Sequence, residues 1–462
     1  MAFLIGGSNS AADTGYDVAN SCRFDGSSAY MHKTPGSTGN VYTATFSAWI
    51  KRGSNLAAQQ ELWTSFPGTE ITHLLFSATT GTLHFQAYSS SSATTNVETT
   101  RRFNDPGAWY HIVVAMDTTE STAANRVKIF VNGGSAETAL EQNTYESEDG
   151  TLSFNTSGRP FYLGTYPTPE NFFNGYMAEV CWIDGTAYAP SDFGEFDEDS
   201  PTIWKPKDVS GLTFGTNGFY LDFEDSSNLG NDVNGGTDLT EVNLAAVDQA
   251  TDSPTNNFCT MNPLDNFYAA SVFSEGNCRV VTDSTSQTWN TSTFGLSAGK
   301  WYCEITIIDE GSNGGVLVGI TDRPSESAST ELGELATSYA YLSSGQFRTN
   351  NGNTANSVAA TDGDIIGIAL NLDDNEISYY KNNVLIVAAQ SITAPASTEN
   401  GVYFIASSDY LDNDTTTNDH NFGNPVVAHS SAANDASGYG SFEYAPPSGF
   451  LAICTKNLAT YG

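Results

Sequence analysis

The chain has 462 residues, more than one hydrophobic core usually serves, so two or three domains are expected. Its 17 Lys and Arg stand against 53 Asp and Glu, and the net charge of −36 argues against binding to nucleic acid or to an anionic membrane, because both require clustered cations. Only 15% of the residues are charged. Such a surface suits an all-β protein that meets an outside medium, or a soluble protein adapted to salt.

The N-terminus contains a short apolar cluster, Phe3, Leu4 and Ile5, and its first basic residue is Arg23. This pattern does not fit a secretory signal, and no apolar run approaches the roughly 20 residues of a membrane span. We therefore expect a protein that is made in a cytoplasm and kept there until it is released. Residues 1–20 are predicted to form an arm that docks onto a partner or a sister subunit through Phe3, Leu4 and Ile5. Packing against the chain's own first domain is the alternative.

Short segments in which apolar and polar residues alternate predict β-strands along most of the chain. Leu83 to Tyr88 and Trp109 to Met116 are examples, and Gly, Asn, Ser and Thr clusters separate such segments. The predicted fold class is all-β, with two antiparallel β-sandwiches joined by an ordered connector. The expected divisions are an arm at 1–20, a first sandwich at 21–200, a connector at 201–266 and a second sandwich with a closing strand at 267–462.

The first sandwich carries five motifs in a fixed order. They are Phe24 to Tyr30, Phe46 to Arg52, Trp109 to Val114, Asn125 to Gly133 and Phe173 to Glu179. Their order resembles the laminin-G/concanavalin A-like lectin family, in the form common in marine phage proteins. The resemblance implies a jelly roll, and we expect Trp49, Trp109 and Ile129 to pack between its two sheets. Asn132 and Gly133 should supply the positive φ angles of a tight turn.

The same fold also occurs in glucanases, which carry a Glu-x-Asp-x-x-Glu motif on one strand. The nearest approach here runs from Glu195 to Ser200 and has Ser where the acid/base should be. We interpret it as a solvated acidic segment and predict that the protein is not an enzyme. His73 and His84 could face each other across a turn, but two histidines without a third ligand make a weak metal site.

Calcium is kept as an alternative to the absence of a cofactor, because relatives of this fold hold it on the sandwich rim. Asp25, Asp117 and Asp184 are the candidate ligands, since each is expected at the end of a strand. Short Asp side chains at such positions also cap turns through their own backbone, and we favour that interpretation. The six cysteines lack metal-ligand spacing, and most are expected to be buried thiols.

The second sandwich resembles a SPRY domain. The resemblance is carried by Gly299 to Ile305, Val318 to Ile320, Gly363 to Leu372, Tyr379 to Asn383, Val402 to Phe404 and Asn421 to Gly423. SPRY domains bind through variable loops, and the aromatic candidates for such loops are Trp289, Tyr339, Tyr341 and Tyr410. The alternative is that these rings are buried. Leu451 to Cys454 should add a closing strand after Pro446 and Pro447.

A sugar site needs an exposed ring beside hydrogen-bonding groups in a shallow cleft. Trp63, Phe66 and Tyr88 are the candidates in the first sandwich, with burial of Trp63 in the core as the alternative. Together these features predict a non-enzymatic phage virion-surface protein, in a tail fibre, a tail tip or a capsid decoration, that recognises host-surface glycans. Its expected partners are other virion proteins, bound through the N-terminal arm, and further copies of itself. The alternatives are a decoration protein that binds no glycan and a glycan depolymerase.

Overall fold

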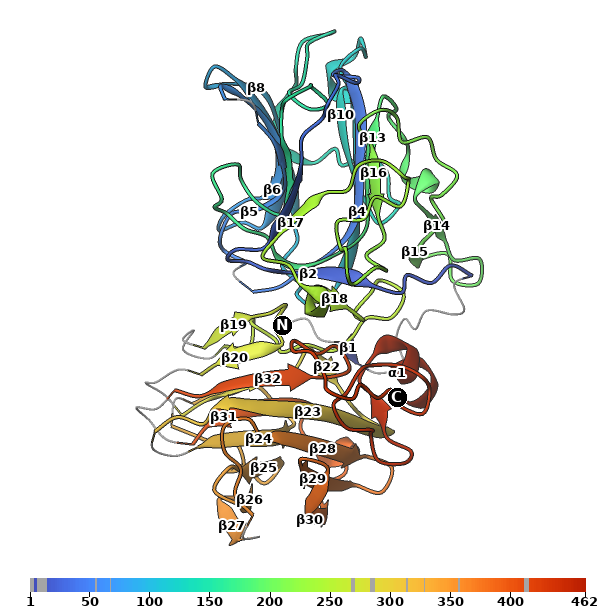
Figure 1. The fold of residues 1–462 in the computed structure, drawn as a ribbon. Coiled ribbons are helices and arrows are strands. Elements are labelled where there is room, and N and C mark those ends of the chain that lie inside the picture. Colours follow the sequence, from blue (N-terminus) through green and yellow to red (C-terminus); the bar gives the residue numbers. More distant parts are fainter. Residues whose placement is uncertain are drawn as a thin grey trace. The chain divides into compact units, whose positions relative to one another are not determined.

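The computed structural model describes residues 4–5, 15–54, 56–66, 68–266, 271–282, 287–312, 315–327, 329–355, 358–410 and 415–462. The predicted all-β fold class is confirmed, since the described residues form strands throughout and a single α-helix, α1 (Thr455–Tyr461) (Figure 1). The chain divides into two compact units. We call residues 13–255 the N-terminal unit, and residues 1–12 with 256–462 the C-terminal unit.

The N-terminal unit contains two large antiparallel sheets. The seven-stranded sheet has the order β10 (Val127–Val131), β9 (Trp109–Asp117), β4 (Thr43–Arg52), β13 (Asn174–Asp184), β2 (Ser21–Asp25) and β18 (Gln249–Ala250), and β16 (Phe219–Leu221) pairs with β13. The eight-stranded sheet has the order β11 (Leu140–Thr144), β8 (Ser92–Arg102), β7 (Thr82–Ser89), β6 (Glu70–Phe76), β5 (Gln60–Ser65), β12 (Phe161–Leu163), β3 (Tyr30–Lys33) and β17 (Thr240–Val242). A short hairpin, β14 (Gly194–Phe196) with β15 (Trp204–Pro206), and the 3-10 turns Ala123–Asn125, Pro190–Asp192 and Ala246–Asp248 complete the unit.

Large aromatic side chains fill the space between the two sheets. Trp63 on β5 and Trp182 on β13 are buried, and their ring centroids lie 4.9 Å apart in an edge-on arrangement. Phe161 packs against both rings, at 5.7 and 4.9 Å. Such large buried rings remove much apolar area from water, so this cluster holds the two sheets together.

The outer face of the seven-stranded sheet is covered by residues 185–255, which we call the cover segment. Its Phe193, Phe214 and Tyr220 form a buried cluster with Val113 and Ile183 of the sheet. The cover segment also contributes β16 and β18 to this sheet and β17 to the other sheet. The stretch expected as a connector is therefore ordered, and its residues up to 255 belong to the N-terminal unit.

A buried histidine attaches the cover segment to the sheet. Trp204 of β15 donates a hydrogen bond from Nε1 to Nδ1 of His111 at 3.0 Å, and Ser47 Oγ lies 2.9 Å from Nε2. The His111 ring stacks on Trp49 with centroids 4.9 Å apart. Burial lowers the pKa of His111 to about 3, so the ring is neutral near pH 7. Trp49 and Trp109 thus contact the cover, and the expectation that they pack between the sheets is wrong.

A buried ion pair lies under the end of the cover segment. Lys51 Nζ on β4 is 2.6 Å from Asp252 Oδ2, and both side chains are almost fully buried. Trp109 donates a hydrogen bond from Nε1 to the other carboxylate oxygen at 3.0 Å. Each charge has its partner inside the protein, which offsets the high cost of removing charges from water.

The C-terminal unit is a second sandwich. One sheet has the order β19 (Val272–Ser274), β20 (Arg279–Val281), β32 (Thr417–Asn421), β23 (Lys300–Asp309), β28 (Ile365–Asn371), β29 (Glu376–Lys381) and β30 (Val384–Ser391), with β33 (Leu451–Ala452) paired to β23. The other has the order β21 (Trp289–Thr291), β31 (Phe404–Asp409), β24 (Val316–Thr321), β25 (Ser338–Leu342), β26 (Gln346–Thr349) and β27 (Gly352–Ala355). β1 (Leu4–Ile5) pairs in parallel with β22 (Phe294–Gly295), and a 3-10 turn spans Pro395–Ser397.

The C-terminal tail covers part of this unit's first sheet. Glu304 on β23 accepts hydrogen bonds from the backbone N–H groups of Glu443 and Tyr444, both at 2.8 Å. Phe442 packs on Tyr302, with ring centroids 5.3 Å apart. The expected closing strand at Leu451 is present as β33. The tail is therefore part of the folded unit.

Replacing Asp252 by Ala should lower the free energy of unfolding of the N-terminal unit by about 3 to 5 kcal/mol, because the buried Lys51 loses its counter-charge. Urea titration of the full chain, followed by tryptophan fluorescence, measures the change. Glu137→Ala is the control, since it breaks the exposed Arg101–Glu137 pair and should cost about 1 kcal/mol or less. Equal effects of the two substitutions would contradict the prediction.

Candidate functional site

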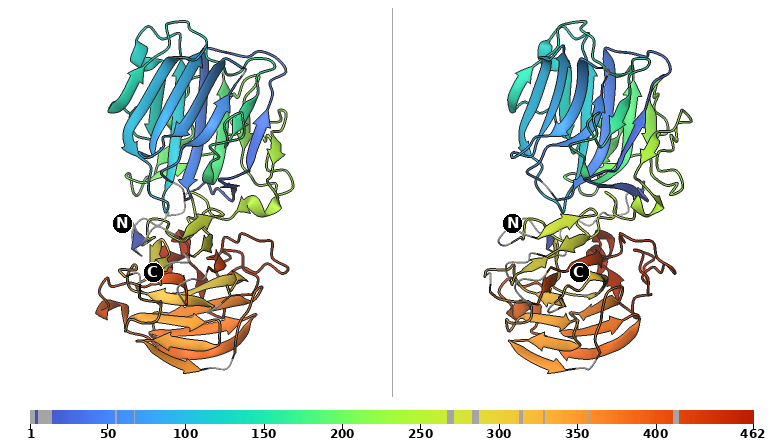
Figure 2. Two further views of the ribbon diagram at one scale, coloured as in Figure 1. Left: turned by 90° about the vertical axis from the view of Figure 1, so that its left-hand side faces the viewer. Right: turned by 60° about the vertical axis from the view of Figure 1, so that its left-hand side comes forward.

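The outer face of the eight-stranded sheet is open in the N-terminal unit. Figure 2, left, looks onto this sheet. At its middle, Tyr166 of the loop after β12 lies against the buried His73 of β6. We call this surface the open face. The opposite outer face, on the seven-stranded sheet, lies under the cover segment. A ligand that binds a sheet of this unit therefore has one broad surface available.

Strand register places a row of polar and aromatic side chains across the open face. Residues directly opposite each other in antiparallel strands point to the same side of a sheet. The row is His32 on β3, Tyr162 on β12, Thr64 on β5, His73 on β6, Gln86 on β7 and Asn96 on β8. It crosses six neighbouring strands and offers rings at one end and amides at the other.

Four half-buried rings gather at one end of this row, and we call them the aromatic cluster. They are Tyr30, His32, Tyr162 and Phe172. The Tyr30, His32 and Tyr162 centroids lie 5.9 to 6.2 Å apart, and Phe172 lies 6.4 Å from Tyr30. Rings in contact at such distances support one another's orientation while leaving part of each face exposed.

The middle of the open face combines a hydrogen-bonded His–Glu pair with two tyrosines. His73 Nδ1 lies 3.1 Å from the buried carboxylate of Glu61, which also accepts a hydrogen bond from Thr64 Oγ1. The rings of Tyr88 and Tyr166 lie about 6 Å from His73, at 6.2 and 6.1 Å. The pair fixes the imidazole between the two tyrosines.

The far end of the row is rich in hydrogen-bonding groups. Gln86 donates from Nε2 to the Tyr88 hydroxyl at 3.0 Å. His84 hydrogen-bonds Asn96, and Ser77 donates to Glu98 at 2.9 Å. His73 and His84 do lie on one face of neighbouring strands, but each has its own acidic or amide partner.

A small pocket lies at the rim of the sandwich beside Tyr88. Its volume is about 210 Å³, and its lining consists mainly of hydroxyl and carboxylate side chains. The residues are Glu70, Thr72, Ala87, Tyr88, Ser89, Thr94, Glu146, Thr151, Leu152 and Ser153. Arg159 neutralises Glu70 through a 2.6 Å ion pair. The pocket adds further acid and hydroxyl groups next to the open face.

The three predicted sugar-binding rings have different positions. Trp63 is fully buried between the sheets, so its assignment as an exposed ring is wrong. The bulge in β5 between Glu61 and Trp63 turns its side chain toward the core. Phe66 is half-buried just after β5, and Tyr88 is half-buried on the open face. Tyr88 is thus the predicted residue that the fold places at the candidate site.

Three of the four aromatic candidates in the C-terminal unit lie in strands and are buried. Trp289, Tyr339 and Tyr341 are at most 5% exposed, so their assignment to variable loops is wrong. Tyr339 and Tyr341 are two residues apart on β25, so both side chains point to the same face, into the core between the sheets. Tyr410 follows β31, is half-buried, and lies under the Arg348 guanidinium, which is 5.2 Å from its ring.

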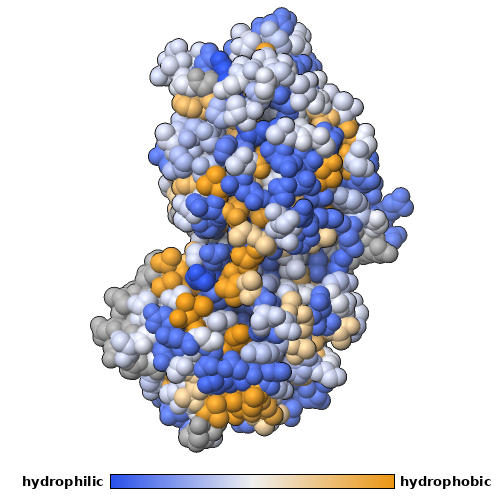
Figure 3. All heavy atoms as spheres, in the orientation of Figure 1, coloured by the Kyte–Doolittle hydropathy of each residue, from blue (hydrophilic) through white to orange (hydrophobic). Residues whose placement is uncertain are grey.

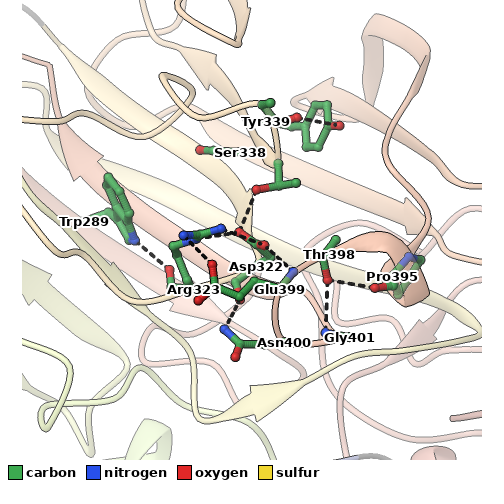
Figure 4. A network of polar contacts seen from close by, with 12 residues as sticks. Trp289, Asp322, Arg323, Ser338, Tyr339, Pro395, Thr398, Glu399, Asn400 and Gly401 are labelled. Atoms are coloured by element: carbon green, nitrogen blue, oxygen red, sulfur yellow. Dashed lines mark hydrogen bonds and ion pairs between the residues drawn. The ribbon is translucent and has the colours of Figure 1, made fainter.

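The loops after β24 and before β31 are tied together by the buried carboxylate of Asp322 (Figure 4). It accepts hydrogen bonds from Thr337 Oγ1 at 2.7 Å and from the Glu399 backbone N–H at 3.1 Å. Arg323 forms an ion pair with Glu399 at 2.7 Å, and its carbonyl accepts from Trp289 Nε1. These contacts give the loop region a defined conformation.

Asp25 and Asp117 form the local hydrogen bonds that cap turns, whereas Asp184 accepts from the backbone of two distant segments, at Asn40 and Asn217. Burial alone would raise the pKa of Asp25, but N–H groups of Ser27, Ser28 and Ala29 lower it to about 2. Asp117 accepts from Thr119 N–H at 3.0 Å, and Asp184 accepts from Asn40 N–H at 2.7 Å. Among the described residues, no group of three or more His, Cys, Asp or Glu could hold a metal ion.

Two other predicted features have clear positions. Glu195 and Asp197, in and just after β14, lie 3.6 and 3.4 Å from Lys205, away from the open face. In the predicted attachment arm, Leu4–Ile5 forms β1, whereas Phe3 lies outside the described residues.

All six cysteines are buried free thiols. Within the described part of the chain, no helix is long and apolar enough to span a membrane.

Comparison with protein families fits this division of the chain. A laminin-G model of the concanavalin A-like lectin/glucanase superfamily matches residues 25–188, and a SPRY domain model matches residues 300–406. The chain carries a concanavalin A-like domain followed by a SPRY domain. No curated protein sequence matches it. The SPRY match runs from the start of β23 into β31 of the C-terminal unit, and the laminin-G match ends at residue 188, within the first residues of the cover segment.

Solved structures with similar folds include single domains and domain pairs. The SPRY domain of human HERC1 is 16% identical, covers 35% of this chain and 96% of its own, and has a TM-score of 0.29. A Bacteroides ovatus protein, provisionally named carbohydrate-binding, is 18% identical with 50% and 61% coverage and a TM-score of 0.34. Domains LG4 and LG5 of the mouse laminin alpha1 chain are 11% identical, with 89% coverage of both chains and a TM-score of 0.31.

Glu304 of the SPRY domain is a buried glutamate with a raised pKa. Glu179, on β13 of the concanavalin A-like domain, is another. Burial raises its pKa to about 7, although hydrogen bonds from Tyr220 and Tyr16 oppose the shift. These hydroxyls donate at 2.7 and 3.0 Å. Glu179 sits in a bulge with a φ of 51°, under the cover segment and away from the open face. We interpret it as a structural group.

The pKa of Glu179 is raised from 4.5 to about 7, so the concanavalin A-like domain should lose stability progressively as the pH rises from about 4.5 to about 7, where the buried carboxylate ionises, and no further above that. Glu179→Gln should remove this loss, so that the variant becomes more stable than the wild type by up to about 3 kcal/mol above pH 8 and similar to it near pH 4. Urea titrations at both pH values measure the difference. The exposed Glu141→Gln variant is the control and should follow the wild type.

Proposed function

We propose that the protein is a non-enzymatic glycan-binding protein and that the open face of its concanavalin A-like domain holds the sugar. The observation that carries the proposal is the aromatic cluster of Tyr30, His32, Tyr162 and Phe172 beside a row of amide and hydroxyl groups. The concanavalin A-like match and the provisionally named Bacteroides ovatus protein support a role in carbohydrate binding.

The open face supplies what carbohydrate recognition requires. Sugar rings have apolar C–H faces that pack on aromatic rings, and hydroxyl edges that need both donors and acceptors. Tyr30 and Tyr162 offer half-exposed rings, and Gln86 and Asn96 offer amide groups on the same face of the sheet. The row crosses six strands at roughly 4.8 Å spacing, and Thr64 and His73 at its middle are buried. The rings at one end and the amides at the other would therefore meet different sugar units of an extended chain.

The absence of catalysis is part of this proposal. Two acids of the open face, Glu61 and Glu98, are held by His73 and by Ser77, respectively, in hydrogen-bonded positions that suit structural roles. An assay of reducing-sugar release from the glycan that binds tests this point. Release that is lost in Glu61→Gln or Glu98→Gln would show a depolymerase instead.

We further propose that the protein acts on the surface of a phage particle, as part of a tail fibre, a tail tip or a capsid decoration, and that lysis releases it. What supports this proposal is the resemblance of the first domain's motif order to the form common in marine phage proteins, and both domains have folds that are used for binding. Its partners would be other virion proteins, contacted through the N-terminal arm, and further copies of the chain. Leu4–Ile5 of this arm already pairs with β22 of the same chain, so a partner would have to bind beside that pairing. Antibody labelling of intact particles in the electron microscope would test the location.

One observation favours the second candidate function, a decoration protein that contacts other proteins without binding glycan. The edge strand β30 exposes Val384 and Leu385 to 65% and 49%, and Figure 3 shows an apolar patch where Figure 1 places β29 and β30. Exposed apolar edge strands often pair with other chains. A protein that coats particles but binds nothing on a glycan array would favour this role.

Replacing Tyr30 and Tyr162 together by Ala should weaken glycan binding about tenfold or more, because each stacked ring contributes about 1 kcal/mol. A glycan array followed by calorimetry on the best binder measures the loss. Tyr42→Ala is the matched control, since Tyr42 is exposed elsewhere on the same unit. All variants should melt within a few degrees of the wild type. Undiminished binding by the double variant would remove the open face as the site.

A further inference from the structure

We propose that the open face selects uncharged glycans and discriminates against sulfated and uronic-acid-rich glycans. This inference rests on the proposed glycan-binding function and specifies its substrate class. It is carried by the charges of the concanavalin A-like domain, by the pairing of its cations, and by the neutral hydrogen-bonding groups that register places on the open face.

The domain that holds the open face is strongly acidic. Residues 13–255 contain 31 Asp and Glu against 11 Lys and Arg. Summed over a surface, such an excess produces a negative potential that lowers the local concentration of anions and slows their association. A polyanionic glycan would have to approach against this potential at every repeat unit.

The strands of the eight-stranded sheet contain few cations, and their pairing limits them further. Five acids stand against three cations on these strands: Glu61, Glu70, Glu98, Glu141 and Glu241 against Lys33, Arg101 and Arg102. Lys33 lies 3.6 Å from Asp232, and Arg101 lies 2.9 Å from Glu137. Arg102 is exposed at the last position of β8, away from the central row.

The groups on the open face match hydroxyls better than sulfates. Burial lowers the pKa of His84, so its ring is neutral near pH 7. Gln86, Asn96, Gln142 and Thr144 carry neutral donors and acceptors on the same face. Sulfate and carboxylate groups are usually bound by guanidinium or ammonium groups, which give charge-assisted hydrogen bonds.

The rim pocket strengthens this selectivity. It is lined by Glu70 and Glu146 together with several hydroxyls, and the nearby Arg159 is already paired with Glu70. An anionic sugar unit placed there would meet a second carboxylate, that of Glu146, without a free cation in the described lining. A neutral sugar unit could instead exchange hydrogen bonds with the accessible Ser89 and Thr94.

The test uses pairs of glycans that differ in charge but share a backbone: dextran with dextran sulfate, and desulfated κ-carrageenan oligosaccharides with κ-carrageenan oligosaccharides, added to a general array. For backbones that bind, the neutral member should bind at least tenfold more tightly at 50 mM NaCl. The gap should narrow as salt approaches 0.5 M, because salt screens exposed charges. Binding of the sulfated member as tightly as the neutral one would overturn the inference.

A charge-introduction variant gives the reverse test. Gln142→Lys with Thr144→Lys adds two cations to exposed positions of β11 that share the open face with Glu98 and Asn96. The double variant should raise affinity for the sulfated glycans at least fivefold and leave neutral binding within twofold. Ala389→Lys with Ser391→Lys, on exposed positions of β30 in the C-terminal unit, is the matched control and should change neither.

The outcomes separate the two proposals. If the wild type binds sulfated glycans and loses them in the Tyr30→Ala, Tyr162→Ala variant, glycan binding at the open face stands and only the charge selectivity is overturned. If the wild type binds neither member of any pair and nothing on the array, the proposed function fails, and the inference fails with it. If neutral glycans bind but the lysine variant gains no sulfated binding, local charge is not the determinant and the inference is overturned.

Discussion

The buried contacts between the cover segment and the seven-stranded sheet determine which surfaces of the concanavalin A-like domain remain accessible. Lys51 with Asp252, and His111 with Trp204, hold residues 185–255 over one outer face. These are polar groups removed from water, so they are stabilising only while both partners are present. Because one face is covered, the rings and amides of the other become the broad sheet surface that can meet a ligand.

The sequence predicts the class of fold because alternation along single strands is a local signal. It cannot show which strands become neighbours, and the candidate site depends on that. Tyr30 and His32 are two residues apart on β3 and share a face, but only the pairing of β3 with β12 brings Tyr162 beside them. Trp63 is predicted to be exposed, but a bulge in β5 turns its ring inward. The local sequence pattern contains no signal for this bulge. The two- and three-residue strands of the cover segment are likewise too short to show a period.

The two domains differ in how polar groups are used. In the SPRY-containing unit, Asp322 and Glu304 accept hydrogen bonds from the backbone of loops and of the C-terminal tail, which orders segments without regular structure. In the concanavalin A-like unit, comparable groups on the open face belong to strands and are aligned by register. Side chains on strands hold their positions more precisely than those on loops, which suits recognition of a repeating polymer.

The pairing of β2 with β18 has a consequence for how such a protein can evolve. Ser21 lies opposite Ala250, and Thr255 Oγ1 accepts a hydrogen bond from Val18 N–H, so this unit's chain enters and leaves at one place. Leu4–Ile5, which precede it in the sequence, pair with β22 of the C-terminal unit, which follows it. The concanavalin A-like domain is thus an insertion with adjacent ends, the arrangement in which one domain can be exchanged for another while its host still folds. Recombination at these two junctions would change what the protein recognises and keep the rest of the chain intact.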